Sequence, residues 1–293
     1  MTTVAEAVRT GASALRARGV PSAQFDAELL LAHLLGEEPM RLAADAKRTL
    51  DAATLGAFDR LLERRAGSRE PVQYLTGTQE FYSLEFSVDR RVLIPRAETE
   101  LLVEALLGFR AAERAAGRTV KRIADVGTGS GCIAVAVAVH APEAAVLATD
   151  ISEDAIEVAR ENARRHGVLE RIEFTVADLL DTPAAAGEPL DAILSNPPYV
   201  SEEELPGLEP EVRDHEPKLA LVGPGSGTEP YERLVPQAAL RLRPGGLLAV
   251  EVSGTRAWPV LEMFPDEAWR ERSVRTDMQG IPRVLSAHRR TPR

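Results

Sequence analysis

The sequence predicts an α/β protein in which a mostly parallel sheet, covered by helices on both faces, follows a small all-helical domain and a β-hairpin. Three observations predict this fold. Up to about residue 70, apolar residues recur only at helical spacing. Between Phe81 and Ile94 they alternate with polar residues, which is typical of half-buried strands. Beyond Pro95, strand-like runs alternate with helical segments, which is typical of a parallel sheet.

The N-terminal helices are predicted from the residues at their ends. We expect a first helix ending near Gly19, a second capped by Ser22 and ended by Gly36, and a third following Asp51. The hairpin should turn at residues 89–91, where Asp-Arg-Arg interrupts the alternation. The predicted domains are a helical domain (1–75), a hairpin linker (76–95) and an α/β domain (96–293).

Seven segments of the α/β domain are predicted to be strands, and the last two should be joined by a turn at Gln279-Gly280. Helices are expected between the others, including one from Glu153 to Arg165 that Ser152 can cap. The seven predicted strands are residues 122–126, 145–149, 172–176, 192–195, 247–252, 271–276 and 283–287.

Composition and charge exclude several classes of protein. The chain has 293 residues and a formal net charge of -10, whereas a nucleic-acid-binding surface must be basic. The single cysteine, Cys132, excludes an internal disulfide and is expected in the core. The five histidines have no metal-ligand spacing, so no metal is expected. No run approaches the roughly 18 apolar residues of a membrane span, and no signal pattern is found, so we expect a cytoplasmic protein without a membrane partner.

The most informative motif is Asn196-Pro197-Pro198-Tyr199, which ends the fourth strand of the predicted sheet. Prolines cannot donate to a strand ladder, so the strand stops and leaves Asn196 at the carboxyl edge, where α/β sheets bind ligands. The side-chain oxygen of Asn196 and the Pro197 carbonyl can together accept two N–H groups of an amide or amino group. Tyr199 adds an aromatic face. Pro-Pro alone is also compatible with a rigid turn.

A glycine loop, residues 127–131, follows the first strand and opens a helix. Its Gly-x-Gly-x-Gly spacing differs from the Gly-x-Gly-x-x-Gly that seats a pyrophosphate, and it lacks the lysine of a phosphate-binding loop. Asp150, after the second strand, can accept both hydroxyls of a ribose, and Asp178, after the third, can accept from an adenine amino group. Ile151 and Leu179 would be apolar walls. The pattern predicts a ligand with an adenosine and no diphosphate, although each aspartate alone is compatible with a cap or a turn.

Together these motifs resemble those of the class I S-adenosylmethionine-dependent methyltransferases, which have a Rossmann-like, mostly parallel seven-stranded sheet. Within that class, Asn-Pro-Pro-Tyr is typical of enzymes that methylate a nitrogen conjugated to a π-system. The resemblance implies S-adenosyl-L-methionine as cofactor and S-adenosyl-L-homocysteine as product. The cofactor-binding residues that it implies are Gly127, Thr128, Gly129, Ser130, Gly131, Asp150, Ile151, Asp178, Leu179 and Asn196.

Upstream segments narrow the resemblance to one family. Residues 70–77, 80–81 and 93–100 resemble the peptide chain release factor glutamine methyltransferases (PrmC/HemK family), and the similarity runs almost end to end. The sequence departs from that family at Ala97, where proline is usual, and at residues 223–227, where the family has a shorter glycine run.

The family resemblance implies methylation of the side-chain nitrogen (N5) of the glutamine in the Gly-Gly-Gln motif of class I release factors, which modulates translation termination. Asn196, Pro197 and Tyr199 would be catalytic, and Asn196, Pro197, Pro198 and Tyr199 would hold the substrate. An amide nitrogen is a poor nucleophile because its lone pair is delocalised, so catalysis would consist mainly of aiming it. No strong general base is demanded.

Other functions are compatible with part of the sequence. A ribosomal-protein glutamine methyltransferase would share the fold and the nucleophile, but residues 94–100 match the release-factor branch better. A DNA adenine or cytosine amino-methyltransferase would need a flipped base and a basic surface. A dinucleotide oxidoreductase is disfavoured by the glycine spacing, and a non-catalytic binding module would not require Asn196.

An acidic segment follows the Pro-Pro motif. From Ser201 to Pro217 there are seven carboxylates and one arginine, Arg213. Such a run is typical of a solvated loop. A second hypothesis is that this acidic segment and the helical domain receive the release factor, because a domain that enters the ribosome is expected to be basic.

Overall fold

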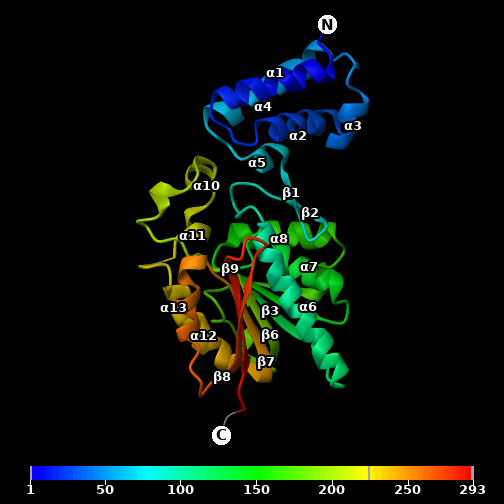
Figure 1. Ribbon diagram of the computed structural model, residues 1–293. Coiled ribbons are helices and arrows are strands. Elements are labelled where there is room, and N and C mark those ends of the chain that lie inside the picture. Colours follow the sequence, from blue (N-terminus) through cyan, green and yellow to red (C-terminus); the bar gives the residue numbers. More distant parts are fainter. Residues whose placement is uncertain (1, 224, 292–293) are drawn as a thin grey trace. The chain divides into compact units, whose positions relative to one another are not determined.

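The computed structural model describes residues 2–223 and 225–291, and contacts within the chain divide it into two units. Unit 1 comprises the chain up to Thr78 together with Leu208–His215, and unit 2 comprises Gln79–Gly207 and the chain from Glu216 onward. Figure 1 shows the N-terminal helices of unit 1 in blue to cyan and its segment Leu208–His215 in yellow-green, whereas unit 2 is drawn in cyan to red. Each unit has its own hydrophobic core, and each is described by itself below.

Unit 1 is helical, as the sequence predicts. Thr3 caps its first helix by accepting from the Glu6 N–H, and Gly36 ends the second with a left-handed φ of 65°. Ser22 precedes the second helix, but its side chain makes no capping hydrogen bond, so that prediction was wrong. The helices are α1 (Val4–Ala17), α2 (Ala23–Leu35), α3 (Pro39–Ala44), α4 (Ala52–Gly67) and α5 (Val72–Thr76), with α10 (Pro210–His215) from the acidic segment.

An internal ion pair network joins α10 to the rest of unit 1. Asp26 and Arg65 are both buried, and their side chains approach to 2.7 Å. Arg65 also lies 2.8 Å from Glu211 of α10, and Arg69 donates to both oxygens of that carboxylate. These partners lower the pKa of Glu211, although its own burial acts in the opposite direction. Glu211 is therefore a structural residue rather than part of a solvated loop.

The sheet of unit 2 has seven strands in the order β5-β4-β3-β6-β7-β9-β8, which confirms the predicted mostly parallel seven-stranded sheet. β3, β4, β5, β6 and β7 pair in parallel, and β9 pairs antiparallel with both β7 and β8. The strands are β3 (Arg122–Val126), β4 (Ala145–Asp150), β5 (Ile172–Val176), β6 (Leu190–Ser195), β7 (Leu242–Glu251), β8 (Trp269–Thr276) and β9 (Pro282–Arg289).

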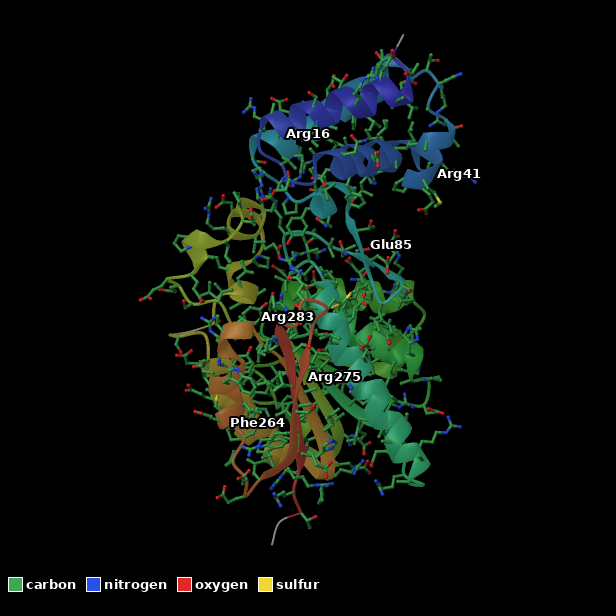
Figure 2. All side chains as sticks on the ribbon, viewed as in Figure 1. Arg16, Arg41, Glu85, Phe264, Arg275 and Arg283 are labelled. Carbon is green, nitrogen blue, oxygen red and sulfur yellow. The ribbon has the colours of Figure 1, made fainter. Side chains whose placement is uncertain are left out.

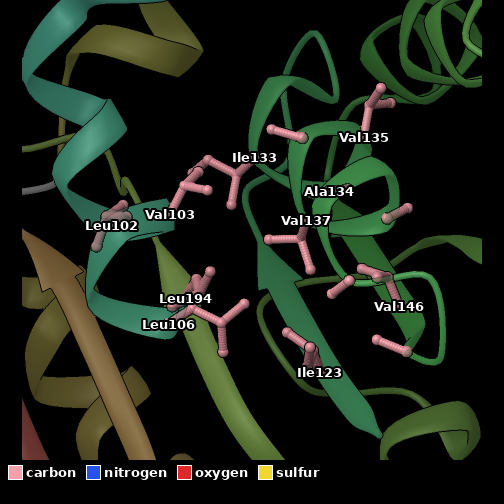
Figure 3. Packing of buried hydrophobic residues seen from close by; sticks show 14 of the residues in the cluster. Leu102, Val103, Leu106, Ile123, Ile133, Ala134, Val135, Val137, Val146 and Leu194 are labelled. Atoms are coloured by element: carbon pink, nitrogen blue, oxygen red, sulfur yellow. The ribbon is translucent and has the colours of Figure 1, made fainter. Parts of the chain in front are cut away.

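Helices cover both faces of this sheet (Figure 1). Successive strand residues alternate between the two cores: Ile123 packs with α6, α7 and α8, whereas Ala124 packs with α12 and α13. Figure 3 shows side chains of α6 and α7 packed against β3 and β6. Cys132 is buried in this core, as expected. The helices are α6 (Glu100–Ala115), α7 (Cys132–His140), α8 (Glu153–Arg165), α12 (Glu229–Arg241) and α13 (Ala257–Glu262).

The predicted hairpin is present, but its turn lies elsewhere. β1 (Thr78–Phe81) and β2 (Leu84–Ser87) are joined at Tyr82 and Ser83, which have φ values of 52° and 60°. A turn is also present at the predicted residues 89–91, where the Val92 N–H donates to the Asp89 carbonyl at 3.1 Å, but it does not join the two strands, so its predicted role as the hairpin turn was wrong. A two-residue turn with two positive φ values normally carries Asn or Gly, so this Tyr-Ser pair gives no turn signal.

Short elements complete unit 2. They include α9 (Pro183–Ala186), α11 (Lys218–Leu221) and four 3₁₀ turns at Ala97–Thr99, Leu169–Arg171, Leu205–Gly207 and Gly254–Arg256. Ala97 starts the first of these turns without the usual proline. In the Gly223-to-Gly227 loop, Pro224 lies outside the described residues. Within the described parts of the chain, no helix is long and apolar enough to cross a membrane.

Candidate active site

Asn196 lies at the carboxyl end of β6, in the centre of the sheet. The hydroxyl of Ser195 donates to the Val126 carbonyl (2.8 Å) and thereby fixes the end of β6 against β3. The Asn196 Nδ2 donates to the hydroxyl oxygen of Thr99 at 3.2 Å. Pro197 is buried, and among the described residues no backbone N–H donates to its carbonyl. The two oxygens that the sequence predicts as acceptors, Asn196 Oδ1 and Pro197 O, are therefore available.

Tyr199 packs against the core that α12 and α13 form with the sheet. Burial, together with the nearby Glu251, raises the pKa of its hydroxyl to about 12. Tyr199 is therefore neutral at physiological pH, so its hydroxyl is not available there as a phenolate base.

The glycine loop begins directly after β3. Gly127, Gly129 and Gly131 have φ values of 73°, 54° and 80°, which residues other than glycine rarely adopt. A Cβ on Gly131 would lie 2.9 Å from the Cβ of Ala159 on α8. A Cβ on Gly129 would meet no atom within 4 Å. Gly131 is therefore needed for packing, whereas Gly129 keeps open space beside the loop.

Asp125, the penultimate residue of β3, fixes the glycine loop through hydrogen bonds to its side chain. Its Oδ2 accepts from the Thr128 hydroxyl (2.6 Å) and from the Ala134 N–H (3.0 Å) at the start of α7. Its Oδ1 is buried and has no hydrogen-bond partner within the described residues. Burial is the main reason that the pKa of Asp125 rises to about 7. An unpartnered buried carboxylate oxygen is costly, which agrees with the raised pKa of this group.

Asp150 ends β4, and both of its oxygens accept backbone hydrogen bonds. Oδ1 accepts from the Ser152 N–H and Oδ2 from the Gly129 N–H, each at 2.9 Å. Asp150 thus forms a turn at the strand-to-helix junction, whereas α8 is capped by the Ser152 side chain, as predicted. Each oxygen keeps a further acceptor position, so the ribose role is compatible with these bonds. Ile151 beside it is an exposed apolar residue, 54% accessible.

Asp178 lies two residues beyond the end of β5, and Leu179 follows with a φ of 55°. The carboxylate of Asp178 accepts from Arg233 of α12 at 2.7 Å. Both side chains are about half exposed, so this ion pair contributes little stability. Its second oxygen can still accept from an amino group, as the sequence analysis expects for an adenine.

One cavity of about 300 Å³ brings most of these residues together. Of the candidate site residues, Gly131, Pro197 and Tyr199 are absent from its lining. The cavity lies at the carboxyl ends of β3, β4, β5 and β6, and its volume suits a small-molecule ligand. The candidate residues that line it are Gly127, Thr128, Gly129, Ser130, Asp150, Ile151, Asp178, Leu179, Asn196 and Pro198.

A larger hollow of about 690 Å³ lies at the opposite end of β7, beside Pro244 and Gly245. Arg243 on its wall is bound by Glu113 and Asp191. The hollow is wide and polar, and none of the motif residues line it. The cavity at the glycine loop is therefore the candidate active site.

Thr99 and Glu251 also belong to this site, although neither was predicted from the sequence. Thr99 lies in the segment that resembles the release-factor family, and its hydroxyl contacts both Asn196 and Glu251. Glu251 is only 3% exposed and ends β7. A signal was present in the sequence: Glu251 is the one charged residue in the otherwise apolar run Leu247–Val252.

The acidic segment is also partly internal. Glu216 is buried, and its carboxylate accepts from Arg96 (2.5 Å) and from the Ile94 N–H (3.3 Å). Glu204 accepts from Arg256 (2.5 Å) and from the Ser201 N–H (3.0 Å). The prediction of a wholly solvated loop was therefore wrong, because Glu204, Glu211 and Glu216 each form an ion pair with an arginine. Glu202 and Glu203 are exposed, and neither has an ion pair in the described part of the chain.

Comparisons with known proteins agree with this fold. Residues 6–77 match the family "PrmC N-terminal domain", and residues 98–207 match the family "Methyltransferase small domain". Among solved structures, the catalytic domain of hMettl16 in complex with a MAT2A 3'UTR hairpin has a TM-score of 0.56 at 12% identity. That alignment covers 89% of this chain and 93% of the other, and at this identity it shows the fold alone.

Curated relatives are similar over nearly their whole length. The "Release factor glutamine methyltransferase" of Moorella thermoacetica is 42% identical, covering 98% of this chain and 99% of the relative. The protein of the same name from Chlorobaculum tepidum is 41% identical, covering 97% and 96%.

The fold, the glycine loop and the cavity at the carboxyl edge define this protein as a class I methyltransferase. Its methyl donor is S-adenosylmethionine. With relatives of this identity and coverage, the chain belongs to the family of release factor glutamine methyltransferases.

Proposed function

We propose that this protein transfers the methyl group of S-adenosylmethionine to the side-chain nitrogen (N5) of the glutamine in the Gly-Gly-Gln motif of class I peptide chain release factors, in the cytoplasm. The observation that carries the proposal is the pair of free acceptors at Asn196 and Pro197, beside a cavity that suits an adenosine-containing ligand. Family membership supports the choice of a release factor as substrate.

The glutamine amide would be bound through its two N–H groups. Asn196 Oδ1 accepts one of them and the Pro197 carbonyl accepts the other. Because the Asn196 Nδ2 already donates to Thr99, the oxygen of that amide is the atom left for the substrate. Two acceptors on one nitrogen fix both its position and the direction of its remaining lobe. This orientation is the main catalytic contribution that we infer for the chain.

The cofactor would lie along the glycine loop. Asp150 would hold the ribose hydroxyls, Asp178 the adenine amino group, and Ile151 and Leu179 the faces of the base. When bound, S-adenosylmethionine supplies a methyl group on a positively charged sulfur. The new N–CH₃ bond would form as the S–CH₃ bond breaks, the bonding electron pair would go to sulfur, and the nitrogen would lose its proton to solvent once the product leaves the site. The neutral Tyr199 would pack against the amide and exclude water.

We further propose that the helical domain, together with the exposed carboxylates Glu202 and Glu203, receives the release factor. The net charge of -10 disfavours a nucleic-acid substrate. No metal is required by the chemistry described above, and no membrane partner is proposed.

A direct assay tests the substrate. The full-length protein is incubated with labelled S-adenosylmethionine and, in parallel, a purified release factor, ribosomal proteins and DNA. We expect label only on the release factor, mapped by mass spectrometry to the glutamine of Gly-Gly-Gln. Label on ribosomal protein alone would favour the ribosomal-protein alternative, and label on DNA alone would overturn the proposal.

The variant Asn196→Ala distinguishes an enzyme from a non-catalytic binding module. Asn196→Ala should lose turnover by about 100-fold or more, because one of the two acceptors is removed, whereas its affinity for S-adenosylmethionine, measured by calorimetry, should fall much less, because the other residues that line the cavity remain. Retained turnover would show that Asn196 does not aim the substrate.

A further inference from the structure

Three side chains of unit 2 form one hydrogen-bonded chain that ends at Asn196. The hydroxyl of Thr99 lies 2.6 Å from Glu251 Oε2, and the Asn196 Nδ2 lies 3.2 Å from the same hydroxyl. Thr99 comes from the 3₁₀ turn before α6, Glu251 from the end of β7 and Asn196 from the end of β6. Thr99 is 2% exposed and Glu251 is 3% exposed, so water does not compete for these bonds.

Glu251 fixes which of these three side chains donate hydrogen bonds and which accept them. An ionised carboxylate can only accept, so the Thr99 hydroxyl must give its single proton to Glu251. The Thr99 oxygen then has only lone pairs left, and it can accept from Asn196 but cannot donate to it. The amide of Asn196 must therefore turn its Nδ2 toward Thr99 and its Oδ1 away. The opposite orientation would place two oxygens in contact with no proton between them.

We propose that Thr99 and Glu251 are positioning residues that hold the Asn196 amide with its oxygen presented to the substrate glutamine. The proposal rests on the proposed role of Asn196 as an acceptor for the substrate amide. It explains why a hydroxyl and a carboxylate are buried beside a site whose reaction demands no general base. It also predicts that a proton on Glu251 weakens catalysis, because a neutral carboxyl can donate to Thr99 and free the hydroxyl proton for the Asn196 oxygen.

The surroundings of Glu251 bring the pKa of its carboxyl close to physiological pH. Its pKa rises to about 7, chiefly through burial and further through Glu98, whereas the Thr99 hydrogen bond, Arg283 and Arg96 oppose the rise. Arg283 lies on β9 (Figure 2), where it donates to Asp277 at 2.8 Å and lies 3.6 Å from Glu98.

Three further groups face Glu251 from other elements. They are Tyr231 of α12, whose hydroxyl donates to the Glu251 backbone carbonyl at 2.8 Å, together with Tyr199 and Cys132. Burial raises the pKa of each of them above its ordinary value, so all three stay neutral between pH 5 and 9. Burial also raises the pKa of the Asp125 carboxyl to about 7, so Asp125 titrates in the same range.

Threonine variants test the positioning role. Thr99→Val keeps the shape of the side chain and removes the hydroxyl, and Thr99→Ser keeps the hydroxyl. We expect Thr99→Val to lower kcat up to about 100-fold with the affinity for S-adenosylmethionine unchanged, and Thr99→Ser to stay within about threefold of the unchanged protein. Equal losses in both variants, or wild-type kcat in Thr99→Val, would overturn the proposal.

A substrate-free measurement separates this proposal from the proposed function. In the ¹⁵N-labelled protein, the side-chain NH₂ signal of Asn196, identified by its loss in Asn196→Ala, should shift with pH through a midpoint near 7. The shift should disappear in Glu251→Gln, in which Asp125 still titrates, and in Thr99→Val. A pH-independent signal in the unchanged protein would overturn the positioning role even if the release factor is methylated. Conversely, the shift is expected even if another protein proves to be the substrate.

Discussion

The side chain of Asn162 on α8 donates to the carbonyl of Ser130 in the glycine loop at 2.9 Å. The same side chain pairs with the backbone of Ser87, accepting from its N–H (2.7 Å) and donating to its carbonyl (3.0 Å). Asn162 is fully buried, and its single amide satisfies three backbone groups, of which the Ser130 carbonyl is buried and the two groups of Ser87 are partly buried. The end of β2 and the glycine loop are thereby held to the same helix.

Replacing Asn162 with alanine should therefore destabilise unit 2 and weaken cofactor binding. Each buried group left without a partner costs roughly 1–3 kcal/mol, so we expect a loss on the order of 3 kcal/mol. Both tryptophans of the chain, Trp258 and Trp269, lie in unit 2, so their fluorescence during urea unfolding reports on that unit. Arg164→Ala, an exposed change on the same helix, is the control and should have little effect. A comparable midpoint for both variants would contradict the role of Asn162.

Two glycines of the same loop should respond differently to alanine. In Gly129→Ala the new Cβ meets nothing within 4 Å, so the fold should survive with a strain of about 1–2 kcal/mol while the methyl group narrows the cofactor cavity. In Gly131→Ala the Cβ would clash with Ala159 of α8, so the fold itself should be weakened. Thermal unfolding measures the second effect, and calorimetric binding of S-adenosylmethionine measures the first. If Gly129→Ala bound the cofactor normally, the loop would not approach it closely.

The stability of unit 2 should depend on pH through Glu113. Hydrogen bonds from Arg118, and further bonds from Arg243, lower the pKa of this carboxyl to about 2. Because the folded pKa lies below the unfolded value of about 4.3, the stabilisation is complete above that value and is lost as the pH falls toward 2. Glu113→Gln should be less stable than the unchanged protein at pH 7, and the difference should shrink as the pH falls below 4.

Urea unfolding followed by tryptophan fluorescence at several pH values measures this dependence. One proton contributes a slope of about 1.4 kcal/mol per pH unit. The control is Glu143→Gln, since Glu143 pairs with Arg110 while remaining 69% exposed, and it should change the slope little. The same slope in Glu113→Gln and in the unchanged protein would show that Glu113 contributes no pH dependence.

Local patterns were sufficient to predict most of unit 2. The strand at residues 172–176 and the helix at 153–165 were predicted at their observed bounds, because each is an uninterrupted run with a clear start and stop. Asp150 and Asn196 line one cavity because parallel strands end at one edge of a sheet.

What the sequence did not predict depends on contacts between distant segments. The Tyr82-Ser83 turn lacks a turn signal, and α3 and α5 are too short to show a period. Thr99 and Glu251 are 152 positions apart, so their hydrogen bond leaves no local pattern. Glu211 is neutralised by arginines of another segment, which a charge count along the chain cannot show.

The exposed part of the acidic segment should contribute to recognition of a basic partner. Glu202→Lys with Glu203→Lys should lower kcat/KM for the release factor by about 10-fold at low salt, because the attraction that speeds encounter becomes repulsion. The loss should disappear near 1 M salt, where the Debye length is about 3 Å. Glu204 is left unchanged because its ion pair with Arg256 supports the loop itself.

The matched control is Glu170→Lys with Glu173→Lys, which makes the same change of net charge at two exposed positions near the start of β5. If recognition is local to the acidic segment, this pair should change kcat/KM less than threefold at any salt concentration. Equal losses in both double variants would instead indicate a response to net charge alone. No loss in Glu202→Lys with Glu203→Lys would exclude these carboxylates from the docking surface, and the helical domain would then be the remaining candidate.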